Sequence, residues 1–275
     1  MMRGMFAAIS GLKNHQIMLD VTANDIANVN TIGYKSARTT FKDSLSQVQR
    51  GAAGANAQTA GSNAAQIGLG DQPGSIDNLM QSGALQSTGN PLDVAIQGDG
   101  FFRVGLGAPP AVPAQVEFTR AGNFTRNQEG FLTTQEGYYV VGRTDPNGAQ
   151  DSLIQVPNDA SGVAIGQDGG VSYIPGGGGA RQTAGYLSLA TFANSAGLER
   201  TSGNRWIAST NSGAETTGTP GGTLGMTTAG AIEMSNVDLA QSFTTMITSQ
   251  RGFQANSRVI STSDEMLQDL VNLKR

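Results

Sequence analysis

Hydrophobic residues near the C-terminal end of the chain recur every seven positions, and this spacing constrains the fold more than any other feature. The series consists of Leu239, Met246, Phe253, Ile260 and Leu267. It lies in the stretch 236–275, which contains no Pro and a single Gly. A heptad repeat of this length is typical of a long helix that packs along one seam, as in a coiled coil. We therefore predict a helix over 236–275, with Ser235 capping its first turn.

The companion positions of this helix are less hydrophobic than the seam. They read Phe243, Gln250, Ser257, Asp264 and Val271, apolar only at the two ends. The flanking positions are nearly all uncharged, and include Ser242, Thr244, Thr245, Ser249, Gln254, Asn256 and Ser261. Isolated coiled coils carry Glu and Lys there, and a charge is costly to bury against other protein. Two interpretations stay open: an ordinary helical hairpin, or helices that contact other protein on several sides.

The N-terminal end carries a similar repeat. Its members are Met5, Leu12, Leu19 and Ile26. The repeat stops at 28–33, where Asn and Gly favour a helix end followed by a turn. We predict a helix over 2–29. Because the two helices share one period, we expect the nine seam positions to form a line of contact, within one subunit or between neighbouring subunits.

Between the two ends the hydrophobic period changes from 3.5 to two. Short alternating segments such as 92–96, 101–104, 116–120 and 137–141 are separated by Gly, with no helical pattern among them. This arrangement favours an antiparallel β domain. The stretches 51–66 and 211–229 are rich in small polar residues, carry one charge between them and are typical of connectors.

Together these patterns predict an α+β chain in which a central antiparallel all-β domain is inserted between two long, coiled-coil-like terminal helices. The expected parts are a terminal helical domain at 1–33 and 235–275, an extended or linker region at 34–75, a β-rich domain at 76–210 and a linker at 211–234. Because the helices flank the insert, they share one end and would pair antiparallel within one chain.

Composition argues against most chemical functions. The net charge is −4 and the 275 residues include no Cys and one His. An acidic chain lacks the electrostatic footprint of a nucleic-acid-binding protein. Without Cys and with only His15, disulfides, thiolate chemistry and multi-His metal sites are excluded. No apolar run reaches the ~18–20 residues of a membrane span. We therefore expect no enzyme activity, no cofactor and no metal.

Individual motifs support the same interpretation. His15 has no carboxylate one helical turn away, which favours a surface or packing role. Gly98–Gly100 and Asp168–Gly170 lack the spacing of phosphate-binding or calcium-binding loops, so we expect hairpin turns. Carboxylates such as Glu129 and Glu136 lie at predicted turns, where a solvated role is expected. A β-rich adhesin and a carbohydrate-active enzyme remain as alternative classes.

Several segments resemble the bacterial flagellar axial proteins, the family of rod, hook and hook-associated subunits. The N-terminal resemblance covers 11–21 and 24–35, including the turn residues Asn24, Asn28, Asn30 and Gly33. The C-terminal resemblance covers 235–239, 250–257 and 264–267, and the central one covers 93–102 and 118–124. The resemblance therefore extends over essentially the whole chain.

This resemblance implies a structural subunit that polymerises with copies of itself into a hollow helical tube. It implies terminal helices in the inner tube, and partners among the neighbouring rod, hook-cap and hook–filament junction proteins. It also implies type III export without a cleaved signal peptide. Within the family the chain is most similar to the hook protein, a flexible joint outside the cell that transmits motor torque. The alternative is a distal rod subunit, part of the drive shaft of the basal body within the cell envelope.

Overall fold

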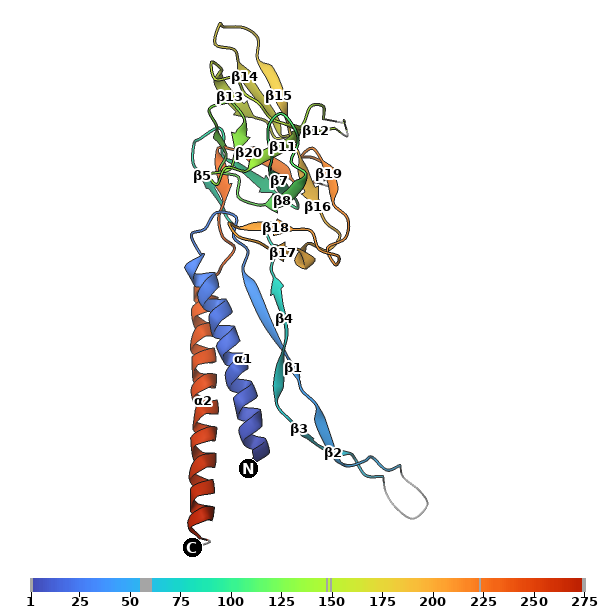
Figure 1. Cartoon of the computed structure of the whole chain (residues 1–275), viewed down its shortest axis with the longest axis vertical. Coiled ribbons are helices and arrows are strands. Elements are labelled where there is room, and N and C mark those ends of the chain that lie inside the picture. Colours follow the sequence, from blue (N-terminus) through green and yellow to red (C-terminus); the bar gives the residue numbers. More distant parts are fainter. Residues whose placement is uncertain (1, 55–60, 147, 149, 223, 274–275) are drawn as a thin grey trace. The chain divides into compact units, whose positions relative to one another are not determined.

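The chain divides into two compact units (Figure 1). The computed structural model describes residues 2–54, 61–146, 148, 150–222 and 224–273. The helical unit contains Met1–Ala27, Ala37–Asn78 and Asp238–Arg275. The β unit contains Asn28–Ser36 and Leu79–Val237. Each unit is therefore assembled from segments that lie far apart in the sequence.

Two long helices form the first part of the helical unit, α1 (Met2–Ala27) and α2 (Leu239–Asn272). They run side by side in Figure 1 and pack against each other. The prediction that Ser235 caps α2 is wrong, because Asp238 accepts hydrogen bonds from Ala240 N at 2.8 Å and Gln241 N at 3.1 Å. No helix in the described part of the chain is long and apolar enough to cross a membrane.

A two-stranded ribbon forms the rest of the helical unit. Strand β1 (Ala37–Asp43) pairs antiparallel with β4 (Asp71–Asn78), and β2 (Ser46–Arg50) pairs antiparallel with β3 (Ala65–Gly68). The range 34–75, predicted as an extended region, thus contains paired strands. Part of the low-complexity stretch 51–66 falls at 55–60, outside the described residues.

The β unit is antiparallel throughout its described strand pairs. Its strands are β5 (Leu85–Ser87), β6 (Val94–Gln97), β7 (Phe101–Leu106), β8 (Gln115–Thr119), β9 (Thr125–Arg126), β10 (Leu132–Thr133), β11 (Tyr139–Arg143), β12 (Asp151–Leu153), β13 (Ser161–Ile165), β14 (Gly170–Ile174), β15 (Gln182–Leu187), β16 (Leu189–Thr191), β17 (Glu199–Arg200), β18 (Arg205–Ile207), β19 (Thr216–Gly218), β20 (Met226–Ala229) and β21 (Ala231–Glu233). The largest sheet has the order β13-β14-β15-β11-β7-β8-β18-β17. The predicted α+β class with a large antiparallel β domain is confirmed.

Side chains from β6, β7, β11 and β15 build the main core of the β unit. It includes Ile96, Phe102, Val140 and Leu187, all essentially inaccessible to solvent. Phe102 and Phe124 meet edge to face at 5.0 Å between ring centroids. A second cluster surrounds Trp206, which is fully buried. Alternating strands place these apolar side chains on the inner faces, as the period of two predicts.

The range 211–234, predicted as a linker, contributes β19, β20 and β21. Strand β20 pairs with β6, and β21 pairs with β5. The turn at Gly98–Gly100 therefore does not close a hairpin, because β6 pairs with β20 and not with the following strand β7. The turn at Asp168–Gly170 does close one, between β13 and β14. Sequence-distant pairing decides such cases, and hydrophobic alternation carries no information about it.

Candidate functional site

The interface between α1 and α2 is built from small and polar side chains. The buried residues are Ala8, Gly11, Asn14, Thr22 and Asp25 on α1, which also packs against the ribbon, and Ser249 and Ser263 on α2. The carboxylate of Asp25 accepts from Ala37 N of β1 at 3.2 Å. A helix usually turns its large apolar residues toward its partner. In this pair the positions of closest contact are small instead, which lets the two backbones approach closely.

The predicted seam residues border this interface and do not form its centre. Met5, Leu12, Leu19, Ile26, Met246, Phe253, Ile260 and Leu267 are half-buried, whereas Leu239 is 41% exposed. All five companion positions of α2, from Phe243 to Val271, are exposed. The companion line that faces α1 consists of Ser242, Ser249, Asn256 and Ser263. A seven-residue repeat fixes one line on a helix surface, but the shape of the partner selects which flanking line is covered.

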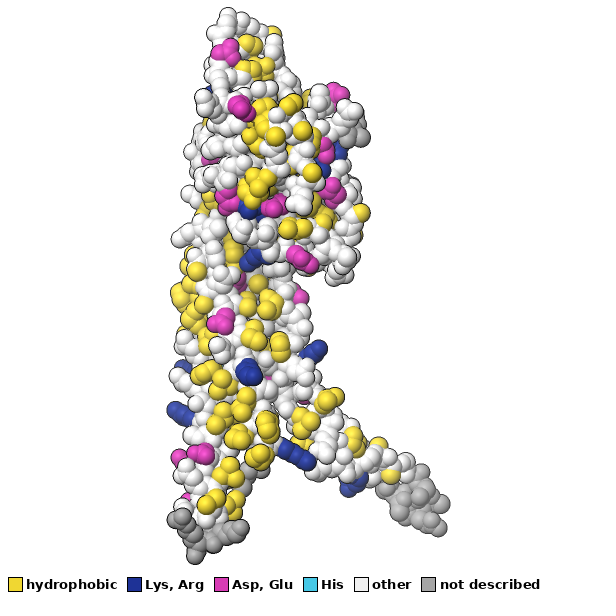
Figure 2. All heavy atoms as spheres, in the orientation of Figure 1, with side chains coloured by type: hydrophobic (Ala, Val, Ile, Leu, Met, Phe, Trp, Pro, Cys, Tyr) yellow, Lys and Arg dark blue, Asp and Glu magenta, His cyan; other side chains and the backbone are white. Residues whose placement is uncertain are grey.

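Large apolar side chains project from the helical unit into solvent. On the helices and at the C-cap of α2 they are Met2, Phe6, Leu239, Phe243, Ile247, Val259, Met266, Leu270, Val271 and Leu273. On the ribbon they are Phe41, Leu45, Val48, Ile67, Leu69 and Ile76. Figure 2 shows hydrophobic side chains scattered over the visible surface of the helices and of the ribbon. Apolar exposure on this scale marks surfaces that contact other protein.

The predicted turn motif has one residue with a clear structural requirement, Gly33. Its φ is +67°, and a Cβ there would lie 2.7 Å from Ala121 N. Its N–H donates to the carbonyl of Glu233 at 2.7 Å. A side chain at this position would be strained and would strike the backbone, so glycine is required.

The three asparagines of the motif lie in different settings. Asn28 Oδ1 accepts from Thr31 Oγ1 at 3.0 Å and so holds the turn. Asn24 lies on the exposed side of α1, and Asn30 is exposed in the turn itself. Asn28 and Gly33 thus support the turn through the contacts named above, and the side chains of Asn24 and Asn30 are exposed.

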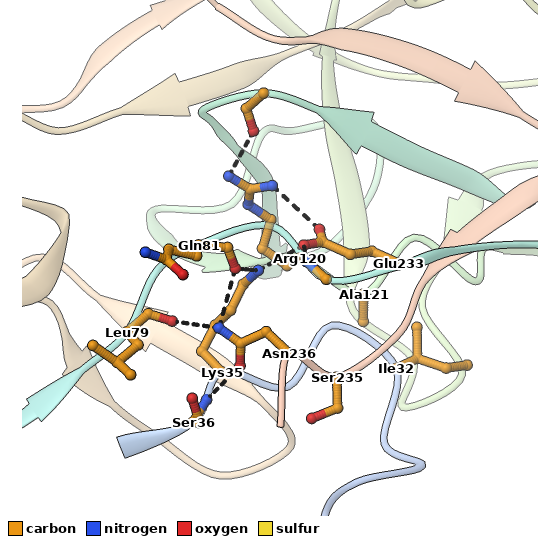
Figure 3. Close-up of polar contacts among 12 residues, drawn as sticks. Ile32, Lys35, Ser36, Leu79, Gln81, Arg120, Ala121, Glu233, Ser235 and Asn236 are labelled. Carbon is orange, nitrogen blue, oxygen red and sulfur yellow. Dashed lines mark hydrogen bonds and ion pairs between the residues drawn. The ribbon is translucent and has the colours of Figure 1, made fainter. Parts of the chain in front are cut away.

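Next to Gly33 lies a fully buried ionic cluster, Lys35, Arg120 and Glu233 (Figure 3). Lys35 Nζ donates to Glu233 Oε1 at 2.6 Å, and Arg120 Nη1 donates to Oε2 at 3.2 Å. Lys35 Nζ also donates to the Gln81 carbonyl at 2.7 Å, and Arg120 Nη2 to the Gly98 carbonyl at 2.9 Å. All three charged side chains are at most 2% exposed.

The ionic cluster holds two cations and one carboxylate. Burial lowers the pKa of Lys35, and the attraction of Glu233 opposes this shift. Glu233 Oε1 accepts a further hydrogen bond from Gly83 N at 2.9 Å, so both carboxylate oxygens are occupied. The buried carboxylate of Glu233 therefore connects three chain segments, those that contain Lys35, Gly83 and Arg120.

Asn236 extends the ionic cluster. Its Nδ2 donates to the Leu79 carbonyl at 2.8 Å and to the Gln81 carbonyl at 3.1 Å, and its Oδ1 accepts from Ser36 N at 2.8 Å. The segments that enter the β unit at 33–36 and leave it at 233–236 are therefore held together. Sequence reasoning missed this cluster because its charges come from three distant segments.

The described residues contain no group of three or more His, Asp or Glu side chains that could hold a metal ion. Several charged side chains that the structure describes form ion pairs with one another. Arg205, for example, donates to Glu117 Oε2 at 2.5 Å and stacks on the Tyr138 ring at 3.8 Å.

Three protein-family models match the chain, and all of them describe flagellar proteins. Residues 5–35 match "Flagella basal body rod protein", residues 95–173 match "Flagellar hook protein FlgE/F/G D1 domain" and residues 228–273 match "Flagellar basal body rod FlgEFG protein C-terminal". The first and third of these segments contain much of α1 and α2, and the second lies within the β unit.

Full-length relatives carry related names. The chain is 48% identical over 277 residues to the flagellar basal-body rod protein FlgG of Bacillus subtilis, covering 100% of both chains. It is 38% identical over 268 residues to the protein of the same name from Agrobacterium fabrum, covering 96% of this chain and 97% of the relative. It is 27% identical over 441 residues to the flagellar hook protein FlgE of Borreliella burgdorferi, covering 100% of both chains.

Proposed function

This chain belongs to the flagellar rod and hook protein family, and from that premise we propose that it is a subunit of the distal rod, the drive shaft of the basal body. The family is one of structural components of the flagellum. The proposal replaces the hook as our preferred assignment, because the relatives favour the alternative.

The observation that carries the proposal is a match in length as well as in sequence. The rod relative from Bacillus subtilis aligns over 277 residues with the 275 of this chain, at 48% identity. The alignment with the hook relative extends over 441 residues at 27% identity, so that relative contains long segments with no counterpart here. A rod subunit accounts for this chain without such losses.

We propose that the exposed apolar surface of the helical unit contacts neighbouring copies of the chain in a helical polymer. Contacts between unlike surfaces of identical subunits generate open helical assemblies. The half-buried seam residues, from Met5 to Ile26 and from Met246 to Leu267, would gain further burial there. The solvent-exposed Phe243 and Ile247, 50% and 52% exposed, would be the largest apolar contributors on α2 near its start.

The ionic cluster supports a stiff subunit. Buried charge pairs with complete hydrogen bonding hold one geometry, because any displacement leaves a charge without its partner. Lys35, Arg120 and Glu233 therefore fix the two ends of the β unit to its strands. We propose that the ionic cluster lets the two chain segments that enter and leave the β unit transmit torque without local deformation.

The proposal implies neighbours and a location. The partners would be further copies of this chain, the adjoining rod and hook proteins, and the type III export apparatus. The subunit would lie in the basal body, within the cell envelope.

Deleting the gene in its own organism and imaging the purified basal bodies tests the assignment. A rod subunit predicts basal bodies whose rod is truncated and that carry no hook. The opposite result, a complete rod that ends without a hook, would restore the hook assignment. A plasmid copy of the gene should return both structures and serves as the control.

A substitution on α2 tests the polymer contact separately. Ile247→Ser should leave the thermal transition of the β unit unchanged, because Ile247 lies in the other unit, and should reduce motility. Gln254→Ser, at another exposed position of α2, is the matched control. If both variants swim like the parent, the exposed surface around Ile247 is not a subunit contact.

A further inference from the structure

Two glycines on opposite helices each receive a polar side chain from the other helix. A Cβ built on Gly11 of α1 would lie 2.6 Å from Asn256 Nδ2 of α2. A Cβ built on Gly252 of α2 would likewise collide with the His15 imidazole of α1. Each helix thus offers one gap and fills one gap in its partner.

The two contacts share one register. Gly11 precedes His15 by four residues on α1, and Gly252 precedes Asn256 by four residues on α2. Because each glycine faces the polar residue of the other helix, the contacts are reciprocal and the helices run antiparallel. Four residues are close to one helical turn, so both contacts lie on the same face.

Moving one helix along the other by a turn destroys this complementarity in either direction. In one direction His15 would face Asn256, and two polar side chains would compete for one space. In the other direction Gly11 would face Gly252, and a gap would open between the helices. Interiors tolerate neither overlap nor voids well.

The polar character of the inserted side chains fits a role in specifying geometry. Among the described residues, His15 Nδ1 is buried without a hydrogen-bond partner, and so are Asn14 Nδ2 and Ser249 Oγ in the same interface. Unsatisfied buried polar atoms oppose stability. Single polar residues in a helix interface are known instead to specify register and partner.

We infer that Gly11, His15, Gly252 and Asn256 form a register lock, which sets the antiparallel pairing of α1 and α2 within one subunit. The seam residues do not set it, because they border the interface and do not form its centre. The inference goes beyond the assignment to the rod and does not depend on it.

Disulfide formation between introduced cysteines reports the register directly, since the chain has no Cys of its own. Continuing the register of the lock pairs Thr22 with Thr245. A shift of one turn would pair Thr22 with Ser249 or with Gln241. Three full-length double variants, carrying Thr22→Cys with Cys at 245, 249 or 241, are oxidised and separated on non-reducing gels. We expect the 22–245 pair to exceed each shifted pair at least ~10-fold, which corresponds to ~1.4 kcal/mol between registers.

Removing the inserted side chains should remove this preference. In a His15→Ala/Asn256→Ala background the three yields should become equal within about twofold, while Gln16→Ala/Gln254→Ala, which truncates exposed residues of the same helices, should retain the tenfold preference. Circular dichroism checks that helicity is preserved. A folded double-alanine chain that keeps the preference would overturn the inference, as would a parent without one.

An exchange variant decides the matter even if the double-alanine chain loses its helices. Gly252→His alone places two imidazoles at one point and should abolish the preference. Adding His15→Gly moves the gap to the other helix and should restore the preference to at least half of the parent value. If the exchange variant performs no better than Gly252→His, the lock does not exist.

Discussion

Replacing Glu233 by Gln is the most informative perturbation of the β unit. Glu233 is the single carboxylate between Lys35 and Arg120, and all three are buried. Glu233→Gln keeps the shape of the side chain but leaves two cations facing each other without compensation. The new amide N–H₂ also points a donor toward a group that can only donate.

The size of the effect follows from this asymmetry. Removing one partner of a buried ion pair costs ~3–5 kcal/mol. For a unit of 150–250 residues each kcal/mol shifts the thermal midpoint by about 2–4 °C, so the midpoint should fall by roughly 6–20 °C. Lys35→Met removes the surplus cation and leaves the neutral Arg120–Glu233 pair. Its unfolding free energy should therefore stay within ~1 kcal/mol of the parent.

Thermal unfolding followed by the fluorescence of Trp206 measures both variants, because Trp206 is the only tryptophan and is buried in the β unit. Glu129→Gln makes the same chemical change at an exposed position and should leave the midpoint unchanged. Equal losses from Glu233→Gln and Lys35→Met would refute the reasoning, since the charge imbalance would then have no part in stability. So would a Glu233→Gln midpoint within about 2 °C of the parent.

Three further outcomes are expected. Burial lowers the pKa of Lys35 in the folded chain below its ordinary 10.5, so at pH values between the folded and the unfolded pKa the unfolded chain binds more protons than the native chain. The stability of the parent relative to Lys35→Met should therefore rise as the pH rises toward 10.5. A difference in thermal midpoint that does not change with pH would contradict this. Gly33→Ala should destabilise the β unit by ~1–3 kcal/mol more than Gly89→Ala in chemical denaturation, because both glycines have positive φ, +67° and +72°, but only Gly33 would meet backbone. A Cβ at Gly4 would meet no atom within 4 Å, so Gly4→Ala should stabilise α1 by up to ~1 kcal/mol and raise the thermal midpoint followed by circular dichroism of the helices. Gly11→Ala should lower this midpoint, because a Cβ there would collide with Asn256. The reverse order would show that the space at Gly11 is not filled.

The two terminal helices and the central strands could be predicted because each has a local signal. A run of heptad positions without Pro determines α2 to within three residues at either end, and Asn28–Gly33 determines where α1 stops. Alternating hydrophobic segments likewise identify most strands of the main sheet. In each case the period of the apolar side chains reflects which face of the backbone is buried.

Elements without a local signal were missed or placed in connectors. Strands β19 to β21 are short and rich in Thr and Gly, and they are held by pairing with strands far away in the sequence, such as β6 and β5. The ribbon β1–β4 has its apolar side chains exposed. A segment whose apolar residues stay largely exposed has no burial pattern to read.

The periodicity of each segment, the family and the narrow apolar seam on each helix can be read from the amino-acid sequence alone. Which side of the seam faces the partner helix depends on the packing of α1 against α2, where small polar residues lie in place of Phe243 and Val271. Only the tertiary structure brought Lys35, Arg120 and Glu233 together, although each is an unremarkable charged residue in its own segment. The reason is physical: local periodicity follows from backbone geometry, whereas the fit of a side chain into a gap and the pairing of buried charges depend on atoms supplied by distant parts of the chain.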